Sequence, residues 1–162
     1  MLKAAHNSLS IECVNLKESR VIVRDAIELS DIDQGETTTQ RFRAVNEIME
    51  GSSSDDGDQN WYYRFAYSVG TRMIFSVENE ISANEDFVPL CEIVAVFVAK
   101  YASNKQLASE DLEAFAESNV GYHVWPYWRE YAQSTCARIN LNPAITIPFY
   151  FVPKTSTEEQ LV

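Results

Sequence analysis

Histidine, cysteine and glycine are scarce in this chain, and their scarcity argues against several kinds of site. Two histidines, His6 and His123, and three cysteines occur among 162 residues. The cysteines are far apart, odd in number and form no C-x-x-C pair, so we expect neither a zinc cluster nor disulfides. Free thiols are typical of a reducing cytoplasm. The five glycines form no phosphate-binding loop, and no G-x-S-x-G is present.

Long apolar segments and positive charge are also lacking. No stretch reaches the roughly 20 apolar residues that cross a bilayer, and MLKAAHNS at the start contains no signal-peptide core. Lys and Arg number 13 against 24 Asp and Glu, for a formal net charge of −11. Such a chain repels nucleic acid and anionic lipid, whereas a basic surface complements it. We expect a cytoplasmic protein with no nucleic-acid partner and no membrane insertion.

Nothing in the pattern assembles a catalytic set. His123 lies beside the helix predicted to carry Cys136, but at ~1.5 Å per residue the two would be ~20 Å apart along the axis. Carboxylates are abundant, yet they gather in predicted loops and tails, where solvation explains them. We therefore expect no enzyme, no metal and no cofactor.

What the chain does contain is β-type alternation in its first two thirds. Residues 9–23 alternate and slip phase at Val14 and Leu16, as at a β-bulge. Residues 26–40 are polar and acidic and predict a loop. Residues 41–50 fit either a short strand or a helical turn. The small polar residues of 51–60 predict another loop.

Two further regions also predict strands. Residues 61–69 and 71–81 alternate in the same phase on either side of Gly70. Gly70 either turns a hairpin or bends one long strand, and the combined length favours two strands. Residues 87–101 are apolar on both faces, which is typical of a strand buried on one side and partly covered on the other.

The period becomes helical after Tyr101. Residues 109–118 predict a helix with Ser109 as its N-cap, ended by Asn119 and Gly121. Pro126 is tolerated in a first turn, so a second helix is predicted from near Trp125 to about residue 139. Residues 145–153 predict an extended segment.

Strands followed by helices predict an α+β fold, a four-stranded antiparallel sheet with helices packed on one face. We expect a single domain over 1–154 and a flexible acidic tail over 155–162.

The second helix is aromatic on two faces. Trp125 and Trp128 share one face, while Tyr127 and Tyr131 point to another. One face fits the chain's own sheet, and the other fits a second subunit or a client. The strand over 87–101 likewise has more apolar surface than two helices cover, with Glu92 as a charge that suits a cationic partner. The predicted apolar peptide-binding groove comprises Phe97, Val124, Trp125, Tyr127, Trp128 and Tyr131.

Four short motifs in register resemble the SecB family of export chaperones. They are LCEI (90–93), the apolar strand ending at Phe97, WPYWREY (125–131) and INLNP (139–143). Residues 10–23 also resemble the family's first strand. The acidic helical piece EDLEAFAES (110–118) is more similar to the SecB-like branch linked to toxin–antitoxin systems.

The resemblance implies a dimer of dimers that holds unfolded polypeptides without ATP. It places partner docking, to a basic tail of the SecA motor, at Glu18, Leu90 and Glu92, although a further family acid falls here at Ile22. It places the oligomer interface at Cys91, Ile93 and Ala95. It leaves the segment between Arg24 and Trp61 as an insert without a clear counterpart, and the family's second long C-terminal helix without an equivalent.

We therefore predict an ATP-independent SecB-like holdase for unfolded or partly folded polypeptides, serving protein export or a dedicated antitoxin. The alternative is a non-chaperone oligomeric interaction protein of the same fold, whose apolar surface is used up in assembly.

Overall fold

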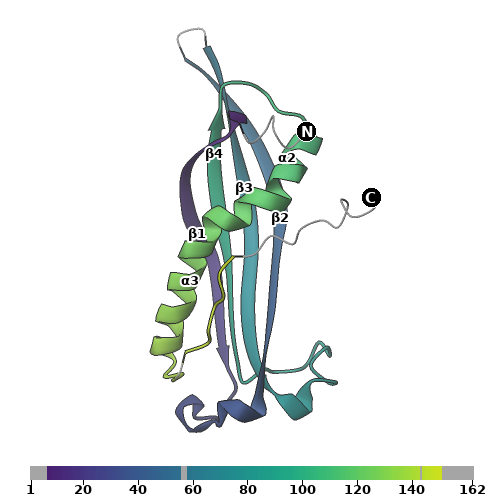
Figure 1. Ribbon diagram of the computed structural model, residues 1–162, viewed down its shortest axis with the longest axis vertical. Coiled ribbons are helices and arrows are strands. Elements are labelled where there is room, and N and C mark those ends of the chain that lie inside the picture. The colour runs from purple at the N-terminus through teal and green to yellow at the C-terminus, as the bar shows by residue number, and fades with distance from the viewer. Residues whose placement is uncertain (1–6, 56–57, 143, 151–162) are drawn as a thin grey trace, which may run out of the picture.

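A four-stranded antiparallel sheet with a helical layer on one face makes up the fold (Figure 1). This computed structural model describes residues 7–55, 58–142 and 144–150. The strand order is β1-β4-β3-β2. The fold class predicted from the sequence is confirmed. The elements are β1 (Ser10–Val23), β2 (Thr37–Asp55), β3 (Asp58–Phe75), β4 (Cys91–Ser103), α2 (Ser109–Phe115), the π-helical turn η4 (Ala116–Val120) and α3 (Gly121–Arg138), with short 3-10 turns η1 (Leu29–Asp31), η2 (Gln34–Glu36) and η3 (Ser76–Glu78).

Strand β1 confirms the expected bulge. Its pairing with β4 shifts register between Leu16 and Glu18, and again between Ile11 and Cys13. Each shift places an extra residue in β1, which moves the following side chains to the other face. The slip of apolar phase in the sequence has this cause.

The loop predicted over 51–60 is wrong. Strand β2 continues to Asp55 and pairs with β3, whose first residue is Asp58. The segment is a β-hairpin arm, and the backbone ladder holds small polar residues extended where their side chains have little to bury. The ambiguous residues 41–50 are strand, and so is 37–40 of the predicted loop. The supposed insert after Arg24 therefore supplies an entire edge strand.

Gly70 does not turn the chain. Strand β3 runs through it unbroken, with Phe42 of β2 on one side and Val94 of β4 on the other. A Cβ at Gly70 would lie 2.2 Å from the Phe42 ring, so the glycine provides room for an aromatic ring rather than a bend. Four strands were predicted, but two of the predicted strands, over 61–69 and 71–81, belong to the single strand β3. The fourth strand of the sheet is β2, which the sequence did not reveal. Length alone was a poor guide because ladders on both sides stabilise a long strand.

The helical region is one continuous run of turns, not two helices. Ala108, not Ser109, is the N-cap of α2, and no side-chain cap bond forms. Asn119 and Gly121 do not end the run, because η4 joins α2 to α3. Pro126 lies inside α3, whose start is Gly121 rather than Trp125. The end at Arg138 agrees with the expected boundary near residue 139.

The core lies between the sheet and α3. Odd positions of β4 are buried and even positions half-buried, as expected for a strand covered fully on one side. Trp128, Ala132 and Cys136 of α3 are buried against it. The segment 144–150 runs back beside α3 (Figure 1), with Ile145 and Ile147 buried. Arg41 of β2 donates a hydrogen bond to the carbonyl of Thr146 at 3.0 Å. This segment therefore connects the helical layer with β2. The sequence predicted an extended segment at this place in the chain. The predicted tail, 155–162, lies outside the described residues.

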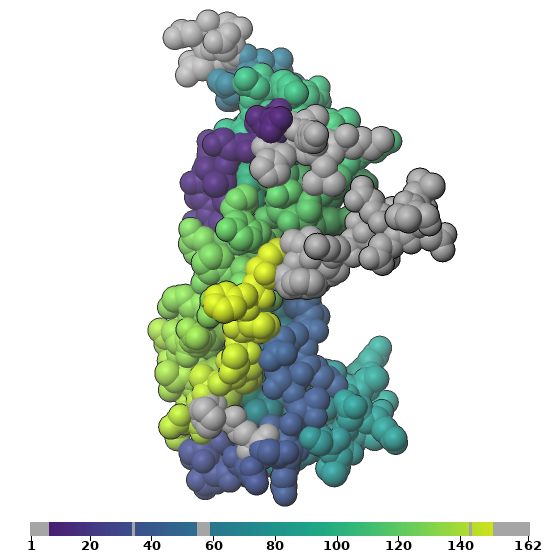
Figure 2. All heavy atoms as spheres, in the orientation of Figure 1, coloured from purple at the N-terminus to yellow at the C-terminus, as the bar shows by residue number. Residues whose placement is uncertain are grey.

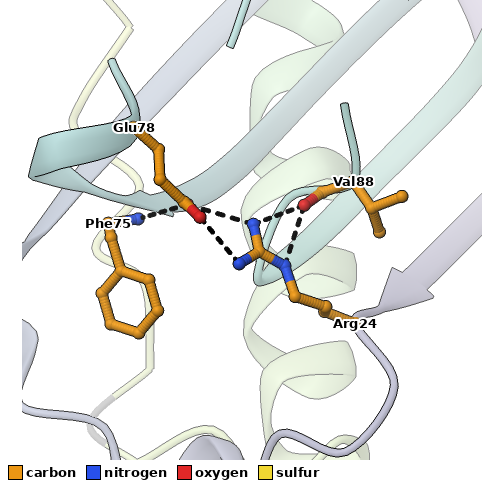
Figure 3. A network of polar contacts seen from close by, with 4 residues as sticks. All are labelled: Arg24, Phe75, Glu78 and Val88. Atoms are coloured by element: carbon orange, nitrogen blue, oxygen red, sulfur yellow. Dashed lines mark hydrogen bonds and ion pairs between the residues drawn. The ribbon is translucent and has the colours of Figure 1, made fainter. Parts of the chain in front are cut away.

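Arg24 clamps the end of β1 to the connection between β3 and β4 (Figure 3). Its guanidinium donates to both carboxylate oxygens of Glu78, at 2.8 and 3.0 Å, and to the carbonyl of Val88. The hydrogen bonds from Arg24, opposed by burial, lower the pKa of Glu78 below its ordinary value. Arg24 also lies 5.6 Å from the centre of the Phe87 ring.

Replacing Arg24 by Met should lower the free energy of unfolding at pH 7 by about 1–3 kcal/mol, because the charge-assisted bonds to Glu78 and to the Val88 carbonyl are lost. The pKa of Glu78 is depressed in the folded state, so its contribution is present above about pH 4.5 and is lost as pH falls through the folded value. The difference from wild type in urea denaturation should shrink at pH 3. Arg20→Met is the control: Arg20 is exposed, and its pair with Glu92 should contribute less than about 1 kcal/mol. Equal costs for both variants would contradict the clamp.

Candidate functional site: apolar and acidic surfaces around α3

Four aromatic side chains of α3 and of the segment 144–150 are exposed or partly exposed. We call this set, Tyr122, Tyr127, Phe149 and Tyr150, the aromatic ridge. The first three are 65%, 48% and 83% exposed. The Tyr150 ring contacts Tyr122 and Trp125 edge-on, with ring centres 6.4 and 5.3 Å apart. Aromatic rings uncovered on this scale are unusual on a monomer and mark a contact surface.

Two local features position the ridge. The indole N–H of Trp125 donates to the carbonyl of Pro148 at 2.7 Å, which fixes the segment against α3. Gly121 has no Cβ, and one placed there would lie 2.3 Å from the Tyr150 hydroxyl. Gly121, which the sequence suggested as a helix end, thus leaves space for the Tyr150 ring. In Figure 2 the segment 144–150 (yellow) lies between α3 (green) and β2 (blue).

A cavity of about 480 Å³ opens on the β2 side of Tyr150. Strand β2 contributes the residues 43–48, the helical layer contributes Glu113, Ala116 and Glu117, and Tyr67 of β3 also lines it. We call this cavity the β2–α2 pocket. The Tyr67 hydroxyl is buried and has no hydrogen-bond partner of standard geometry among the described residues. Burial raises the pKa of Tyr67, neighbouring Tyr150 raises it further, and Arg43 acts in the opposite direction.

A second apolar surface lies along β1, one of the two edge strands of the sheet. Ile11, Leu16, Val21 and Val23 are exposed, and all four pair with positions of β4 that face the helical layer. We call these four residues the β1 surface. An edge strand also presents unpaired backbone N–H and C=O groups, so this side of the molecule suits contact with another chain.

Most of the predicted groove residues lie inside the protomer. Phe97, Val124, Trp125 and Trp128 are buried, Tyr131 is partly buried, and Tyr127 is exposed. The fold does bring Phe97, Trp128 and Tyr131 together, with the Tyr131 ring centre 6.4 Å from each of the other two rings. Among the predicted groove residues, Trp125 contacts the ridge residue Tyr150, and Tyr127 is itself a member of the ridge.

The predicted docking residues differ in their exposure to solvent. Glu18 is exposed on β1, Leu90 is fully buried, and Glu92 accepts an ion-pair contact from Arg20 at 2.8 Å. Arg72 of β3 pairs in register with Glu92. The predicted oligomer residues Cys91, Ile93 and Ala95 are fully buried beneath the helical layer. Burial, together with nearby Cys136, raises the pKa of Cys91 to about 11.

Several residues of the ridge and of the β2–α2 pocket escaped the sequence reasoning. Tyr150 and Phe149 were read only as part of an extended segment, and Tyr67 only as a member of an alternating strand. Glu113 and Glu117 are four residues apart on a predicted helix, a spacing that indicates one shared side. That spacing was the available signal, but β2, which completes the pocket, was not recognised there as a strand.

The fold is that of the SecB-like chaperones. Among solved structures, the chain is similar to the SecB-like chaperone Rv1957 of Mycobacterium tuberculosis, determined in complex with a ChAD peptide from the Rv1956 HigA1 antitoxin. The TM-score is 0.60 and the identity 17%, over 94% of this chain and 97% of that chain. No protein-family model matches the sequence, and no curated protein does. The family resemblance seen in the sequence is confirmed at the level of the fold.

The described residues contain no group of His, Cys, Asp and Glu placed to hold a metal ion. No helix in the part of the chain that the structure describes is long and apolar enough to cross a membrane.

Proposed function

We propose that this protein is an ATP-independent holdase that binds unfolded or partly folded polypeptides in the cytoplasm. The aromatic ridge is the observation that carries the proposal, since the chain leaves these rings uncovered on a fold that in Rv1957 accompanies a bound antitoxin peptide. Apolar side chains of the client would pack on the ridge and so be removed from water. At ~25 cal/mol per Å², several hundred Å² of contact offsets the entropy cost of micromolar binding.

The charge distribution favours a dedicated client over export. A net charge of −11 keeps exposed apolar surface soluble. A basic SecA-type tail would need free carboxylates on the sheet, where Glu92 is paired with Arg20 and faces Arg72. We therefore propose an antitoxin-like client, with docking through Glu18, Leu90 and Glu92 as the export alternative.

We also propose that the protein is a homo-oligomer joined through the β1 surface. The resemblance assigned assembly to Cys91, Ile93 and Ala95. All three pair in register with β1, so they lie directly behind the proposed contact. The aromatic ridge then stays free for client. In the alternative, a non-chaperone interaction protein, the ridge would be covered by assembly.

Stoichiometric protein should suppress the aggregation of chemically denatured malate dehydrogenase without ATP, as measured by light scattering. Tyr122→Ser, Tyr127→Ser and Phe149→Ser combined should raise the ratio needed by about tenfold or more, because three apolar contacts are removed. Val77→Ser is the control, an exposed apolar residue on η3 far from α3 in sequence. A wild type that is a stable oligomer but suppresses no aggregation would favour the alternative.

A further inference from the structure

The segment 144–150 is extended, yet it joins no sheet. It lies between α3 and β2 (Figure 2). Within the described sheet β2 pairs with β3 alone, and no backbone-to-backbone hydrogen bond of the described residues joins 144–150 to β2 or α3. The segment is therefore held in place by side-chain contacts and not by a backbone ladder.

Its side chains alternate between the inside and the outside of the protein. Ile145 and Ile147 are 6% and 2% exposed, whereas Thr146 and Pro148 are exposed. An extended peptide bound in a groove buries every second side chain in the same way, because successive side chains point to opposite sides. The segment thus occupies the space between α3 and β2 as a bound peptide would.

The two walls of this groove each supply a hydrogen-bond donor. Arg41 of β2 donates to the carbonyl of Thr146 at 3.0 Å, and the indole of Trp125 on α3 donates to the carbonyl of Pro148 at 2.7 Å. Both acceptors are main-chain carbonyls, so another extended chain in this position can accept the same bonds. Fixed donors and room for alternate apolar side chains are the requirements for binding an extended polypeptide.

The main contacts that hold the segment are few for seven residues. They are the two buried isoleucines, the two hydrogen bonds and the Tyr150 ring, whose centre lies 5.3 Å from that of Trp125. The conformational entropy lost in ordering seven residues opposes these contacts. Segments with few buried apolar side chains and no backbone ladder open at far lower free energy than the whole domain. We therefore expect 144–150 to leave the groove while α3 and the sheet stay folded.

We propose that residues 144–150 form a displaceable strap. Without client, the strap occupies the groove between α3 and β2, and an extended client segment with alternating apolar side chains takes its place. Phe149 and Tyr150 of the strap also belong to the aromatic ridge, so a client that packs on the ridge already contacts the strap. The inference rests on the proposed function, because it assigns a regulation of the same client-binding surface.

A strap makes the affinity for client depend on how firmly the strap is held. When the binding-competent state is only partly populated, the apparent dissociation constant is the intrinsic one divided by the populated fraction. Loosening a strap therefore tightens client binding, whereas loosening a fixed wall of the site weakens it. The direction of the change distinguishes the two.

Ile147→Ser removes a buried anchor of the strap and leaves both walls of the groove unchanged. The probe is a fluorescein-labelled peptide with the strap's own sequence, AITIPFY. In anisotropy titrations of the full-length protein, the variant should bind this peptide at least about tenfold more tightly than the wild type. The variant should also suppress the aggregation of denatured malate dehydrogenase at a ratio about twofold to fivefold lower.

Two further variants accompany this test. Ile145→Ala is a milder truncation at the other anchor, and it should bind the peptide about threefold more tightly than the wild type. Ile81→Ser is the matched control, because Ile81 is 53% exposed on the connection between β3 and β4. It should bind the peptide and suppress aggregation as the wild type does.

The outcomes separate the strap from the proposed function. If Ile147→Ser and Ile145→Ala bind the peptide as weakly as the wild type or more weakly, while the wild type suppresses aggregation, the strap alone is wrong. If the wild type and all variants fail to suppress aggregation, the proposed function is wrong, and the strap as a regulator of client binding is wrong with it.

Discussion

Replacing Trp128 by alanine is expected to lower the free energy of unfolding by about 3–5 kcal/mol, the range for truncating a fully buried tryptophan. Trp128 is 1% exposed and belongs to the core between α3 and the sheet. Its removal leaves a cavity that rigid strands on one side and the helix on the other cannot close. Urea denaturation at one fixed protein concentration measures the change, because assembly would otherwise alter apparent stability.

The matched control for this variant is Tyr122→Ala. Tyr122 is a large aromatic residue of the same helix, but it faces outward, so its loss should change stability by no more than about 0.5 kcal/mol. A cost below about 1.5 kcal/mol for Trp128→Ala would show that α3 does not pack on the sheet through this residue.

Leu16→Asp combined with Val21→Asp should raise the dissociation constant of the oligomer by about a hundredfold or more. Both side chains belong to the β1 surface, and assembly through it would bury two carboxylates without partners. Sedimentation velocity over a concentration series measures the effect. The folded protomer should survive, since both positions are exposed within it.

Ser10→Asp with Asn15→Asp adds the same charge to β1 on the opposite face, where these residues pair with Ala102 and Val98. This control should shift the dissociation constant by less than about tenfold. If the wild type sediments as a monomer at every concentration, the proposed use of the β1 surface is wrong. An oligomer unchanged by the Leu16 and Val21 variants would place the contact elsewhere.

The local sequence pattern predicted most of the helices and strands that bury one face and expose the other. The face that Trp125 and Trp128 share matches the side of α3 that is buried in the structure. The phase slip in residues 9–23 matches a register shift. In each case the burial of one side leaves a period that is visible without knowing the neighbours.

Elements stabilised by pairing rather than burial were missed. Strand β2 is an edge strand with many polar side chains, so no period marks it, and its backbone ladder with β3 is what keeps it extended. The same omission concealed the β2–α2 pocket, because one of its walls is β2. Glycines 70 and 121 were taken as breaks, although each leaves space for an aromatic ring distant in sequence.

The sequence by itself determined the α+β class, the aromatic character of the last helix and the acidic charge, because composition and period are local properties of the chain. Only the tertiary structure decided which aromatic rings are core and which form the ridge, and that Glu92 is paired with Arg20. Exposure and charge pairing depend on segments far apart in the chain, and the side chains of Arg43, Tyr67, Glu113 and Tyr150 line one pocket only after the sheet and helices have packed.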